Sequence, residues 1–356
     1  MVRLAEATAG TPIHLTVATL RARPDSVLEA ALAAMGTPLV SFAITSPETA
    51  GALPAPRELL RLLRFVRRER FDLINTHLNT SDVVGVLAGF TSGTPVVSTQ
   101  HSVRRTAPNP IRERVRRFAL RHGTVEVIAV GDAVAAVQRA ELGSRRVTVV
   151  PNPAPPPWVP DPSARARVRA EVGLSNDQPV LLAAGRLEPP KDHLMLIEAM
   201  RTVLDQRPEA ALLIAGTGTW AGRLEQRVEA LGCGASVRLL GHRDDIDALY
   251  AAADVFVSSS AWEGMPLSIL EAMAAGLPVV ATDVGDCADV IGAAGMLVPP
   301  GDPAALARAL VESLDPVTRS TRSGASRDRA HLEFGVDAWV RRVARVYDRA
   351  VRGTTP

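Results

Sequence analysis

Apolar and polar positions follow two alternating periods along most of the chain. Short apolar runs rich in β-branched residues, typical of buried strands, alternate with stretches whose apolar residues recur every three or four positions, as in helices. In the first half the predicted strands are Ile13–Leu20, Pro38–Ile44, Phe71–His77, Pro95–His101, Val125–Val130 and Val147–Val150. The helical patterns between them cover Ser26–Met35, Glu58–Arg70, Ser81–Gly89, Pro110–Arg121 and Ala133–Leu142. This alternation predicts a parallel sheet with helices on both faces.

The second half repeats the pattern after a stiff proline-rich spacer. Seven of the twelve residues from Pro151 to Pro162 are proline, which excludes a helix or a central strand there. The predicted strands that follow are Val180–Ala184, Ala211–Ala215, Val237–Leu240, Val255–Ser258, Val279–Thr282 and Gly295–Val298, and a last amphipathic helix covers about Asp337–Ala350. We therefore expect an α/β protein with two doubly wound, Rossmann-like domains. The expected divisions are 1–152, a linker at 153–163, a second domain at 164–335, and a terminal helix at 336–352 that packs back toward the first domain.

Bulk properties narrow the class of protein. The chain has 356 residues, a formal net charge of +2, and no uncharged apolar stretch long enough to cross a bilayer. The first residues lack the apolar core of a signal peptide. Cys233 and Cys287 follow no metal or disulfide spacing, which fits a reducing compartment. We therefore expect a cytoplasmic protein.

One cation stands apart, because Lys191 is the only lysine among 40 basic residues. It follows the apolar run Val180–Ala184 and then Gly185-Arg186, so two cations lie beyond the carboxyl end of a predicted strand. Open α/β sheets bind ligands at that edge. A guanidinium and an ammonium close together suit a diphosphate.

The stretch from Glu263 to Pro278 predicts an anion site on a short helix. Pro266 suits the first helical position and Gly276 the position just after the helix end. The backbone N–H groups near Gly264 and Leu267 can then hold an anion. Glu263 precedes the helix and Glu271 lies in its second turn, so a carboxylate on each side can accept from sugar hydroxyls. The pattern fits a nucleoside diphosphate sugar.

These residues resemble a known family. Gly185-Arg186-Leu187-Glu188 with Lys191-Asp192, then Glu263-Gly264-x-Pro266 with Glu271-Ala272, and Gly276-x-Pro278 through Gly285 are similar to the motifs of retaining glycosyltransferases of family 4, which have the GT-B fold. The resemblance extends from about residue 13 to the C-terminus. It implies that Arg186 and Lys191 hold the donor diphosphate and that the Leu267 amide binds a phosphate. It also implies that Glu271 binds the ribose, that Glu263 binds the transferred sugar, and that Gly241 and His242 lie beside the base.

In the first half, the resemblance concerns the strand that ends in His101. The family has an active-site histidine there, which helps to position the transferred sugar. His77 ends the preceding strand and, with Asn79, is a candidate for the acceptor pocket; Asp82 is a weaker one. The implied activity is that of a hexosyltransferase that moves a hexose from a nucleoside diphosphate sugar to an acceptor hydroxyl with retention. Exopolysaccharide, cell-envelope or glycolipid assembly is the expected setting, with no metal and no cofactor.

The chain also departs from the family. In the family, a strand and a Gly-rich turn precede the first helix, whereas the first residues of this chain resemble a part of that helix. We count six predicted strands in the first half where the family has seven. The missing strand is normally central in the sheet. A start assigned too late is the interpretation that we favour over a shortened or decayed gene. Smaller departures are Pro151-Asn152-Pro153-Ala154 after the last first-half strand, Gly131-Asp132, and Asp289 in place of glutamate.

Arginine-rich stretches raise the question of partners. One cluster recurs at helical spacing from Arg57 to Arg68, and another extends from Arg104 to Arg121. A solvated helix face is the simplest interpretation, and docking to an anionic membrane surface is the alternative. Aromatic residues make up 4% of the chain, too few to interleave the clusters as stacking platforms, which argues against nucleic acid.

Three other functions compete with a transferase. A catalytically silent nucleotide-sugar-binding or scaffold protein would keep the donor site without turnover. A sugar-nucleotide epimerase of the same fold would consume no acceptor. A nicotinamide-dependent oxidoreductase is the third, because Gly216-x-Gly218 with Ala221 after a predicted strand is compatible with a dinucleotide fingerprint. Against it, the next strand ends in Gly241-His242 without an acidic residue for ribose.

Overall fold

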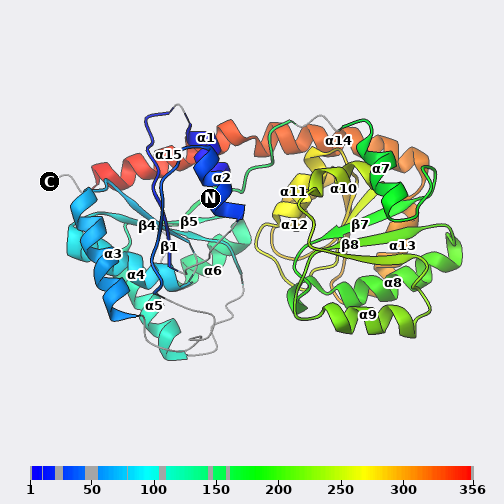
Figure 1. The fold of residues 1–356 in the computed structure, drawn as a ribbon, viewed down its shortest axis with the longest axis horizontal. Coiled ribbons are helices and arrows are strands. Elements are labelled where there is room, and N and C mark those ends of the chain that lie inside the picture. Colours follow the sequence, from blue (N-terminus) through cyan, green and yellow to red (C-terminus); the bar gives the residue numbers. More distant parts are fainter. Residues whose placement is uncertain are drawn as a thin grey trace. The chain divides into compact units, whose positions relative to one another are not determined.

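The computed structural model describes residues 2–9, 11–20, 27–44, 55–77, 79–103, 110–142, 147–157 and 161–353. The chain divides into two compact units. The N-terminal unit comprises residues up to His101, Arg105–Pro151 and the segment from Val336 onward, and the C-terminal unit comprises Asn152–Gly335 together with Ser102–Arg104. Figure 1 labels the elements of both units.

All strands of the C-terminal unit pair in parallel, in the order β12-β11-β10-β7-β8-β9. The strands are β7 (Val180–Ala184), β8 (Ala211–Ala215), β9 (Val237–Gly241), β10 (Val255–Ser258), β11 (Val279–Thr282) and β12 (Gly295–Val298). Their helices are α7 (Ala164–Glu171), α8 (His193–Gln206), α9 (Ala221–Ala230), α10 (Ile246–Ala252), α11 (Leu267–Ala274), α12 (Cys287–Ile291), α13 (Pro303–Ser313) and α14 (Pro316–Phe334).

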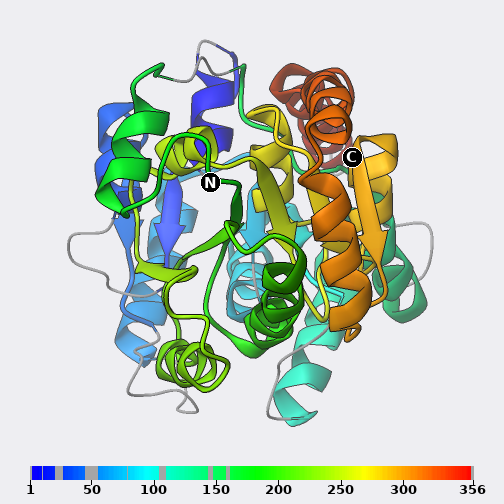
Figure 2. The same ribbon diagram turned by 90° about the vertical axis from the view of Figure 1, so that its right-hand side faces the viewer.

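Helices cover both faces of this sheet (Figure 2). Because β8 and β9 follow β7 in one direction, right-handed connections place α8 and α9 on one face, where α13 packs against α8. The chain then returns to β10 and continues in the opposite direction, which places α10 and α11 on the other face. Buried side chains of β7, β8 and α8 form the core, and most are fully inaccessible.

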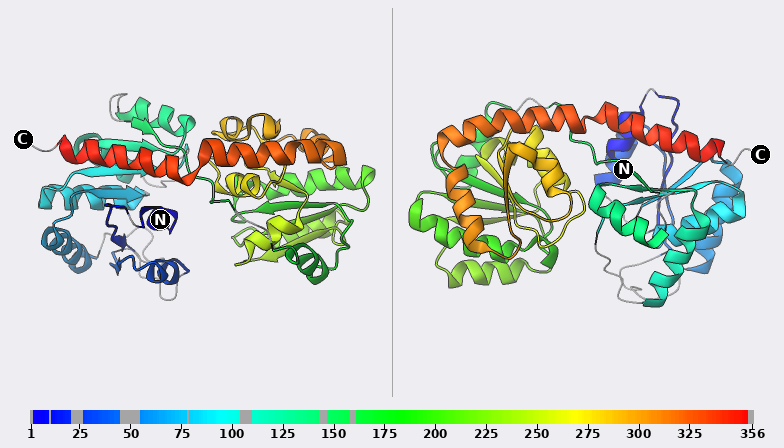
Figure 3. Two further views of the ribbon diagram at one scale, coloured as in Figure 1. Left: turned by 90° about the horizontal axis from the view of Figure 1, so that it is seen from above. Right: turned by 180° about the vertical axis from the view of Figure 1, so that it is seen from behind.

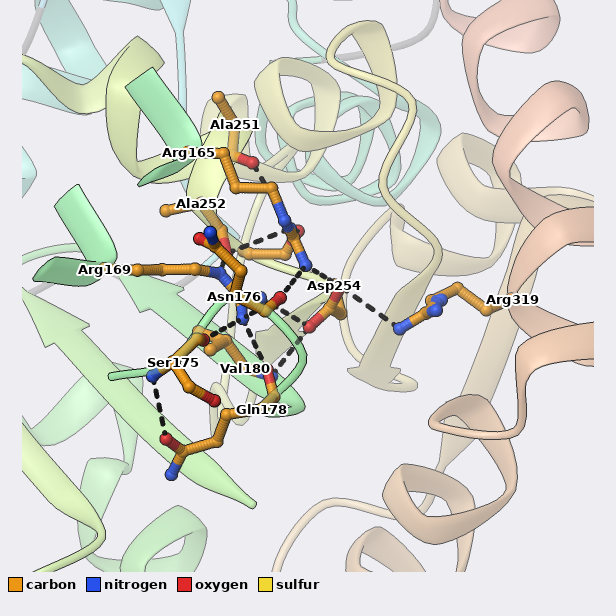
Figure 4. A network of polar contacts seen from close by, with 11 residues as sticks. Arg165, Arg169, Ser175, Asn176, Gln178, Val180, Ala251, Ala252, Asp254 and Arg319 are labelled. Atoms are coloured by element: carbon orange, nitrogen blue, oxygen red, sulfur yellow. Dashed lines mark hydrogen bonds and ion pairs between the residues drawn. The ribbon is translucent and has the colours of Figure 1, made fainter. Parts of the chain in front are cut away.

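A buried ionic cluster joins the elements at the amino ends of β7 and β10 (Figure 4). Asp254 accepts hydrogen bonds from Arg169 Nη2 at 2.8 Å, Arg165 Nη2 at 2.9 Å and the backbone N–H of Val180 at 2.8 Å. Arg319 of α14 lies 3.1 Å from the same carboxylate. The Arg169 side chain is fully buried and also donates to carbonyl oxygens of Ser175, Asn176, Gln178 and Ala252. Burial lowers the pKa of Arg169, and the charge of Asp254 opposes that shift. The cluster therefore fastens α7, β7, β10 and α14 together.

The described strands of the N-terminal unit form two separate parallel sheets. One pairs β1 (Val17–Thr19) with β2 (Leu39–Ser41), and the other has the order β3-β4-β5-β6, with β3 (Ile74–His77), β4 (Val96–Gln100), β5 (Glu126–Ala129) and β6 (Val147–Val149). The resemblance implied a further strand in the centre of one continuous sheet. No strand among the described residues joins the two ladders.

The helices of this unit are α1 (Val2–Thr8), α2 (Val27–Ala34), α3 (Pro56–Glu69), α4 (Asn79–Ser92), α5 (Pro110–Gly123), α6 (Asp132–Leu142) and α15 (Val336–Arg352). Because β3, β4, β5 and β6 succeed one another in the sheet, right-handed connections place α4, α5 and α6 on the same face. On the other side, α15 packs Val343 and Val346 against Val97 and Ile128, and Tyr347 accepts a hydrogen bond from Asn75 Nδ2 at 2.7 Å. Figure 3 shows α15, in red, running along this unit.

Candidate active site

Lys191 and Glu263 meet at the carboxyl edge of the C-terminal sheet. Lys191 Nζ lies 2.5 Å from Glu263 Oε1, and the two side chains are only 21% and 15% exposed. Ser260 Oγ donates to the same carboxylate oxygen at 2.8 Å. The pair lies 72 positions apart in sequence, so the fold brings it together. Arg186 follows the same strand end as Lys191, and its side chain is exposed.

Hydrogen bonds from hydroxyl groups fix the backbone at Lys191 and at Ser260, the residue that contacts Glu263. Lys191 ends a 3₁₀ turn at Pro189–Lys191, and its carbonyl oxygen accepts from Ser259 Oγ at 2.9 Å. Ser260, which holds the Glu263 carboxylate, is itself held, because its carbonyl oxygen accepts from Thr282 Oγ1 at 2.6 Å. Sequence reasoning missed these hydroxyl residues, since serine and threonine beyond strand ends carry no distinctive signal.

Two further residues fix the loop before α11. Gly285 has φ +58°, and a Cβ at this position would lie 2.4 Å from the Glu263 carbonyl oxygen, so only glycine permits this approach. Asn152 Nδ2 donates to the Met265 carbonyl oxygen at 3.1 Å. In the segment Pro151-Asn152-Pro153-Ala154, which departs from the family pattern after its Pro-Asn pair, the asparagine therefore supports the loop that carries Glu263.

The structure corrects one detail of the helix α11, at whose start the sequence predicted an anion site. Pro266 is the N-cap residue with an extended backbone, and the helix begins at Leu267; the sequence analysis wrongly gave Pro266 the first helical position. Extended backbone at Pro266 lets the chain turn into the helix from the Glu263 loop. Leu267, the first residue of the helix, is exposed. Gly276 follows the helix end with φ +81°, as predicted.

Glu271 projects from the second turn of α11. Its Oε2 accepts a hydrogen bond from the Tyr250 hydroxyl at 3.1 Å, and its side chain is half-buried. This contact orients the carboxylate from the neighbouring helix α10. Tyr250 was not predicted, because an aromatic residue on a buried helix face usually indicates core packing.

The glycine pair after β8 has a packing role. A Cβ at Gly216 would lie 1.8 Å from the Gly185 carbonyl oxygen, and one at Gly218 would lie 2.3 Å from the Leu187 carbonyl oxygen. Glu188 secures the same loop, because its carboxylate accepts from the Thr219 backbone N–H at 2.9 Å and from the Thr219 hydroxyl at 2.8 Å. These hydrogen bonds lower the pKa of Glu188. Close backbone approach therefore accounts for both glycines without a dinucleotide.

Gly241 and His242, the candidates for the base, stand at the end of β9. The Gly241 carbonyl oxygen accepts from the Gly216 N–H at 2.7 Å, and Gly241 has φ +66°. The His242 ring is 69% exposed and lies 3.1 Å from Asp244. Asp245 occupies the N-cap position of α10, which begins at Ile246, and its side chain makes no capping hydrogen bond.

In the N-terminal unit, the strand ends bring His77 and His101 into contact. His77 Nδ1 lies 3.0 Å from His101 Nε2, and the rings stack with centroids 5.3 Å apart. His77 Nε2 is buried and has no hydrogen-bond partner among the described residues. Burial, followed by the charge of His101, lowers the pKa of His77 to about 3, and lost hydration also lowers the pKa of His101.

Asp82 has a structural role beneath this pair. Its fully buried carboxylate accepts from Thr76 Oγ1 at 2.8 Å, Ser98 Oγ at 2.7 Å and Gln100 Nε2 at 3.0 Å, and pairs with Arg116 at 3.0 Å. It thereby ties the ends of β3 and β4 to α4 and α5.

Asn79 begins α4, and its side chain lies outside the described residues. Arg104 and Arg105, from the second arginine cluster, also lie outside the described residues.

No group of three or more histidine, cysteine, aspartate or glutamate side chains within the described ranges could hold a metal ion.

Family models match both halves of the chain. A model described as Glycosyltransferase Family 4 matches residues 1–156, and one described as Glycosyl transferases group 1 matches residues 178–315. A D-inositol 3-phosphate glycosyltransferase of Thermobispora bispora is 31% identical over 79% of this chain and 71% of the relative. The chain belongs to glycosyltransferase family 4. This membership confirms the enzyme class that the sequence predicted, a family 4 hexosyltransferase.

Another relative of this family 4 chain has a lipid-linked substrate in its name. It is an Escherichia coli UDP-Gal:alpha-D-GlcNAc-diphosphoundecaprenol alpha-1,3-galactosyltransferase, 27% identical over 64% of this chain. The match spans 62% of that relative's length.

Solved structures share the fold of this family 4 enzyme. Anabaena HepE in complex with UDP-glucose superposes with a TM-score of 0.82 at 22% identity, covering 98% of this chain and 95% of the other. Sucrose-phosphate synthase of Thermosynechococcus elongatus gives 0.80 at 23% identity, covering 99% and 92%. The predicted α/β class and GT-B fold are confirmed. No helix in the described part of the chain is long and apolar enough to span a bilayer.

Proposed function

We propose that this family 4 enzyme is a retaining hexosyltransferase whose donor is a nucleoside diphosphate sugar. The observation that carries the proposal is the Lys191–Glu263 pair, partly buried at the carboxyl edge of the sheet and next to the start of α11. In the proposed complex Arg186, Lys191 and the Gly264–Leu267 amides hold the diphosphate. Glu263 accepts from hydroxyls of the hexose, Glu271 from those of the ribose, and Gly241 and His242 border the base.

The proposed reaction breaks the bond between the anomeric carbon and the β-phosphate oxygen, which keeps the electron pair. The acceptor hydroxyl oxygen forms the new bond on the same face of the sugar, and its proton passes to the leaving phosphate. Negative charge grows on the β-phosphate in the transition state, where two cations and the positive end of α11 are already in place. Protein cations meet the need that a metal would otherwise serve, so we propose a reaction without metal or cofactor.

The acceptor is proposed from the relatives' names. A diphosphoundecaprenol-linked sugar is named as the substrate of the Escherichia coli relative, and HepE binds UDP-glucose. We accordingly propose a lipid-linked acceptor in exopolysaccharide, cell-envelope or glycolipid assembly. An acceptor of this kind is anchored in a bilayer, so the proposal includes a cytoplasmic protein attached peripherally to the inner face of the plasma membrane.

The test is a screen of purified protein for hydrolysis of UDP- and GDP-hexoses, followed by acceptor trials with the best donor and determination of the anomeric configuration of the product. We expect one donor to be turned over and the product to keep its α configuration. Donor binding measured by calorimetry without any turnover would instead support a silent nucleotide-sugar-binding protein. Conversion of the donor sugar without an acceptor would support an epimerase.

The histidine pair yields a separate prediction about tautomers. A buried N–H without a partner is costlier than a bare ring nitrogen, so His77 places its proton on Nδ1 and donates to His101 Nε2. His101 then carries its proton on Nδ1, which we propose faces the transferred sugar. Asparagine keeps an amide near the position of Nδ1, whereas glutamine reaches toward that of Nε2. We expect His77→Asn to keep most of the transfer rate and His77→Gln to lose roughly tenfold, the effect of one hydrogen bond.

Initial rates between neutral and mildly acidic pH check this prediction. Because both histidine pKa values lie below their ordinary range, the pair stays neutral near pH 6.5, and the wild-type rate should not fall there. His77→Asn should keep that flat profile. Equal losses in the asparagine and glutamine variants would contradict the tautomer assignment and leave His77 as a packing residue.

A further inference from the structure

Large apolar side chains are exposed on two neighbouring helices of the N-terminal unit. On α4, Phe90 is 89% exposed and Leu87 39%; on α5, Phe118 is 68%, Ile111 66% and Val115 49% exposed. A single exposed apolar residue is ordinary, but five large ones on two helices that pack against each other indicate an interaction surface. We call Leu87, Phe90, Ile111, Val115 and Phe118 the α4–α5 ridge.

The ridge faces away from the sheet. The strand order places α4 and α5 on the same face of the sheet, and the two helices pack against each other. Ile111, Val115 and Phe118 recur at i, i+4 and i+7, so they form one stripe along α5. The buried residues of α5, Arg116 and Leu120, lie on the opposite side of the helix. The apolar stripe of α5 therefore lies on the side of the helix that faces away from the sheet.

Arginines flank the stripe. On the helical wheel of α5, Arg112 lies on one side of the apolar stripe, and Arg114 and Arg121 lie on the other; all three are exposed. The one acidic residue of α5, Glu113, pairs with Arg116. The neighbouring α3, which packs against α4, adds the exposed residues Arg57, Arg61, Arg64, Arg67 and Arg68. Three glutamates lie on the same two helices, since Glu58 and Glu69 of α3 pair with Arg61 and Arg68 and Glu113 of α5 pairs with Arg116. The arginines of α3 and α5 outnumber these acids, so the two helices carry a net positive charge.

The chemistry of the ridge selects its partner. A second copy docking with the same face would bring arginines against arginines. Nucleic acid would suit the arginines and Phe118, which does stand between Arg117 and Arg121, contrary to the expectation that no aromatic interleaves the clusters. The aliphatic side chains of Leu87, Ile111 and Val115 offer bases nothing to stack on. An apolar stripe bordered by arginines matches the boundary between acyl chains and anionic headgroups.

We propose that the α4–α5 ridge docks the N-terminal unit onto an anionic membrane surface. Phe90, Ile111 and Phe118 enter the boundary between headgroups and acyl chains, and the surrounding arginines contact lipid phosphates. Attachment by this surface requires neither the donor nor catalysis. Its failure is therefore distinguishable from failure of the proposed transferase activity, which is measured with a water-soluble donor.

The experiment is co-sedimentation of the full-length chain with vesicles of phosphatidylglycerol and phosphatidylcholine, or of phosphatidylcholine alone, at low and high salt. We expect binding to the anionic vesicles, weakened by salt but not abolished. Ile111→Ser/Phe118→Ser should reduce partitioning at least tenfold at either salt concentration, because it removes buried apolar area. Arg114→Gln/Arg121→Gln should reduce it mainly at low salt.

Leu332→Ser is the matched control, since Leu332 is 82% exposed but lies on α14 of the other unit; it should bind like wild type. Donor hydrolysis in solution and the thermal transition should be unchanged in the ridge variants, which establishes that they are folded. Absence of wild-type binding to the anionic vesicles at low salt would overturn the proposal. So would a dimer in sedimentation velocity, or retention of an oligonucleotide, that is lost in Phe118→Ser while vesicle binding is unaffected.

Discussion

Replacing Lys191 by alanine is expected to slow glycosyl transfer roughly 10- to 100-fold while the chain stays folded. The ammonium lies 2.5 Å from Glu263 at the edge where we propose the diphosphate leaves. A charge-assisted hydrogen bond that strengthens as charge develops on the leaving group contributes about 1.5–3 kcal/mol, which corresponds to this loss in rate. The measurement is kcat for the best nucleotide sugar and acceptor, with circular dichroism to monitor folding.

Three variants sharpen this prediction. Lys191→Arg keeps the charge but not its compact geometry and should recover only part of the rate. Glu263→Gln removes the carboxylate that we propose grips the hexose, and should also lower kcat. Arg201→Ala is the matched control, because Arg201 is an exposed cation of the same unit that pairs with Asp205 on α8. A folded Lys191→Ala protein with the full wild-type rate would refute the assignment of the donor site.

Replacing Asp254 by alanine is expected to destabilise the C-terminal unit by about 3–5 kcal/mol, because removing one partner of a buried ion pair strands the other. Arg169 is completely buried, and the Asp254 carboxylate is the anion that faces it. Arg165, Arg319 and the Val180 N–H lose the same acceptor. Urea unfolding followed by circular dichroism measures the change as a lower midpoint.

Asp205→Ala is the control for this prediction. Asp205 is 61% exposed and pairs with Arg201 at the surface, so its loss should change stability by less than about 1 kcal/mol. Below its transition, Asp254→Ala should still turn over donor, since the cluster lies at the amino ends of the strands, away from Lys191. An unchanged urea midpoint in this variant would show that the cluster contributes nothing net to folding.

The sequence located the strands of the C-terminal unit almost residue for residue. Five of the six predicted ranges coincide with strands β7, β8, β10, β11 and β12, and β9 extends one residue further, to Gly241. These strands belong to a parallel sheet that helices cover on both faces, and the four inner strands β7, β8, β10 and β11 are short, largely apolar runs. The N-terminal strands are shorter than their apolar runs; for example, β1 covers Val17–Thr19 within the predicted Ile13–Leu20.

Local sequence patterns could not predict the long-range contacts of the candidate site. Motifs predicted that Lys191 and Glu263 serve one ligand, but not that they pair directly. Asp82 was weighed for the acceptor pocket, and only its buried partners assign it to the scaffold. The supports of the site, such as Ser259, Ser260 and Asn152, act through single hydrogen bonds to backbone or carboxylate atoms. Such bonds depend on how distant segments pack, and they leave no periodicity in the sequence.

The helix α15 has a consequence for how the protein is made. Val343, Val346 and Ala350 complete the core around Val97 and Ile128, yet the ribosome makes them after the whole C-terminal unit. The N-terminal unit therefore cannot complete its core, and one side of its sheet stays uncovered, until the ribosome has made α15 near the end of synthesis. During translation the C-terminal unit can therefore complete its fold before the N-terminal unit does, and chaperones that shield apolar sheet surfaces would act in that interval.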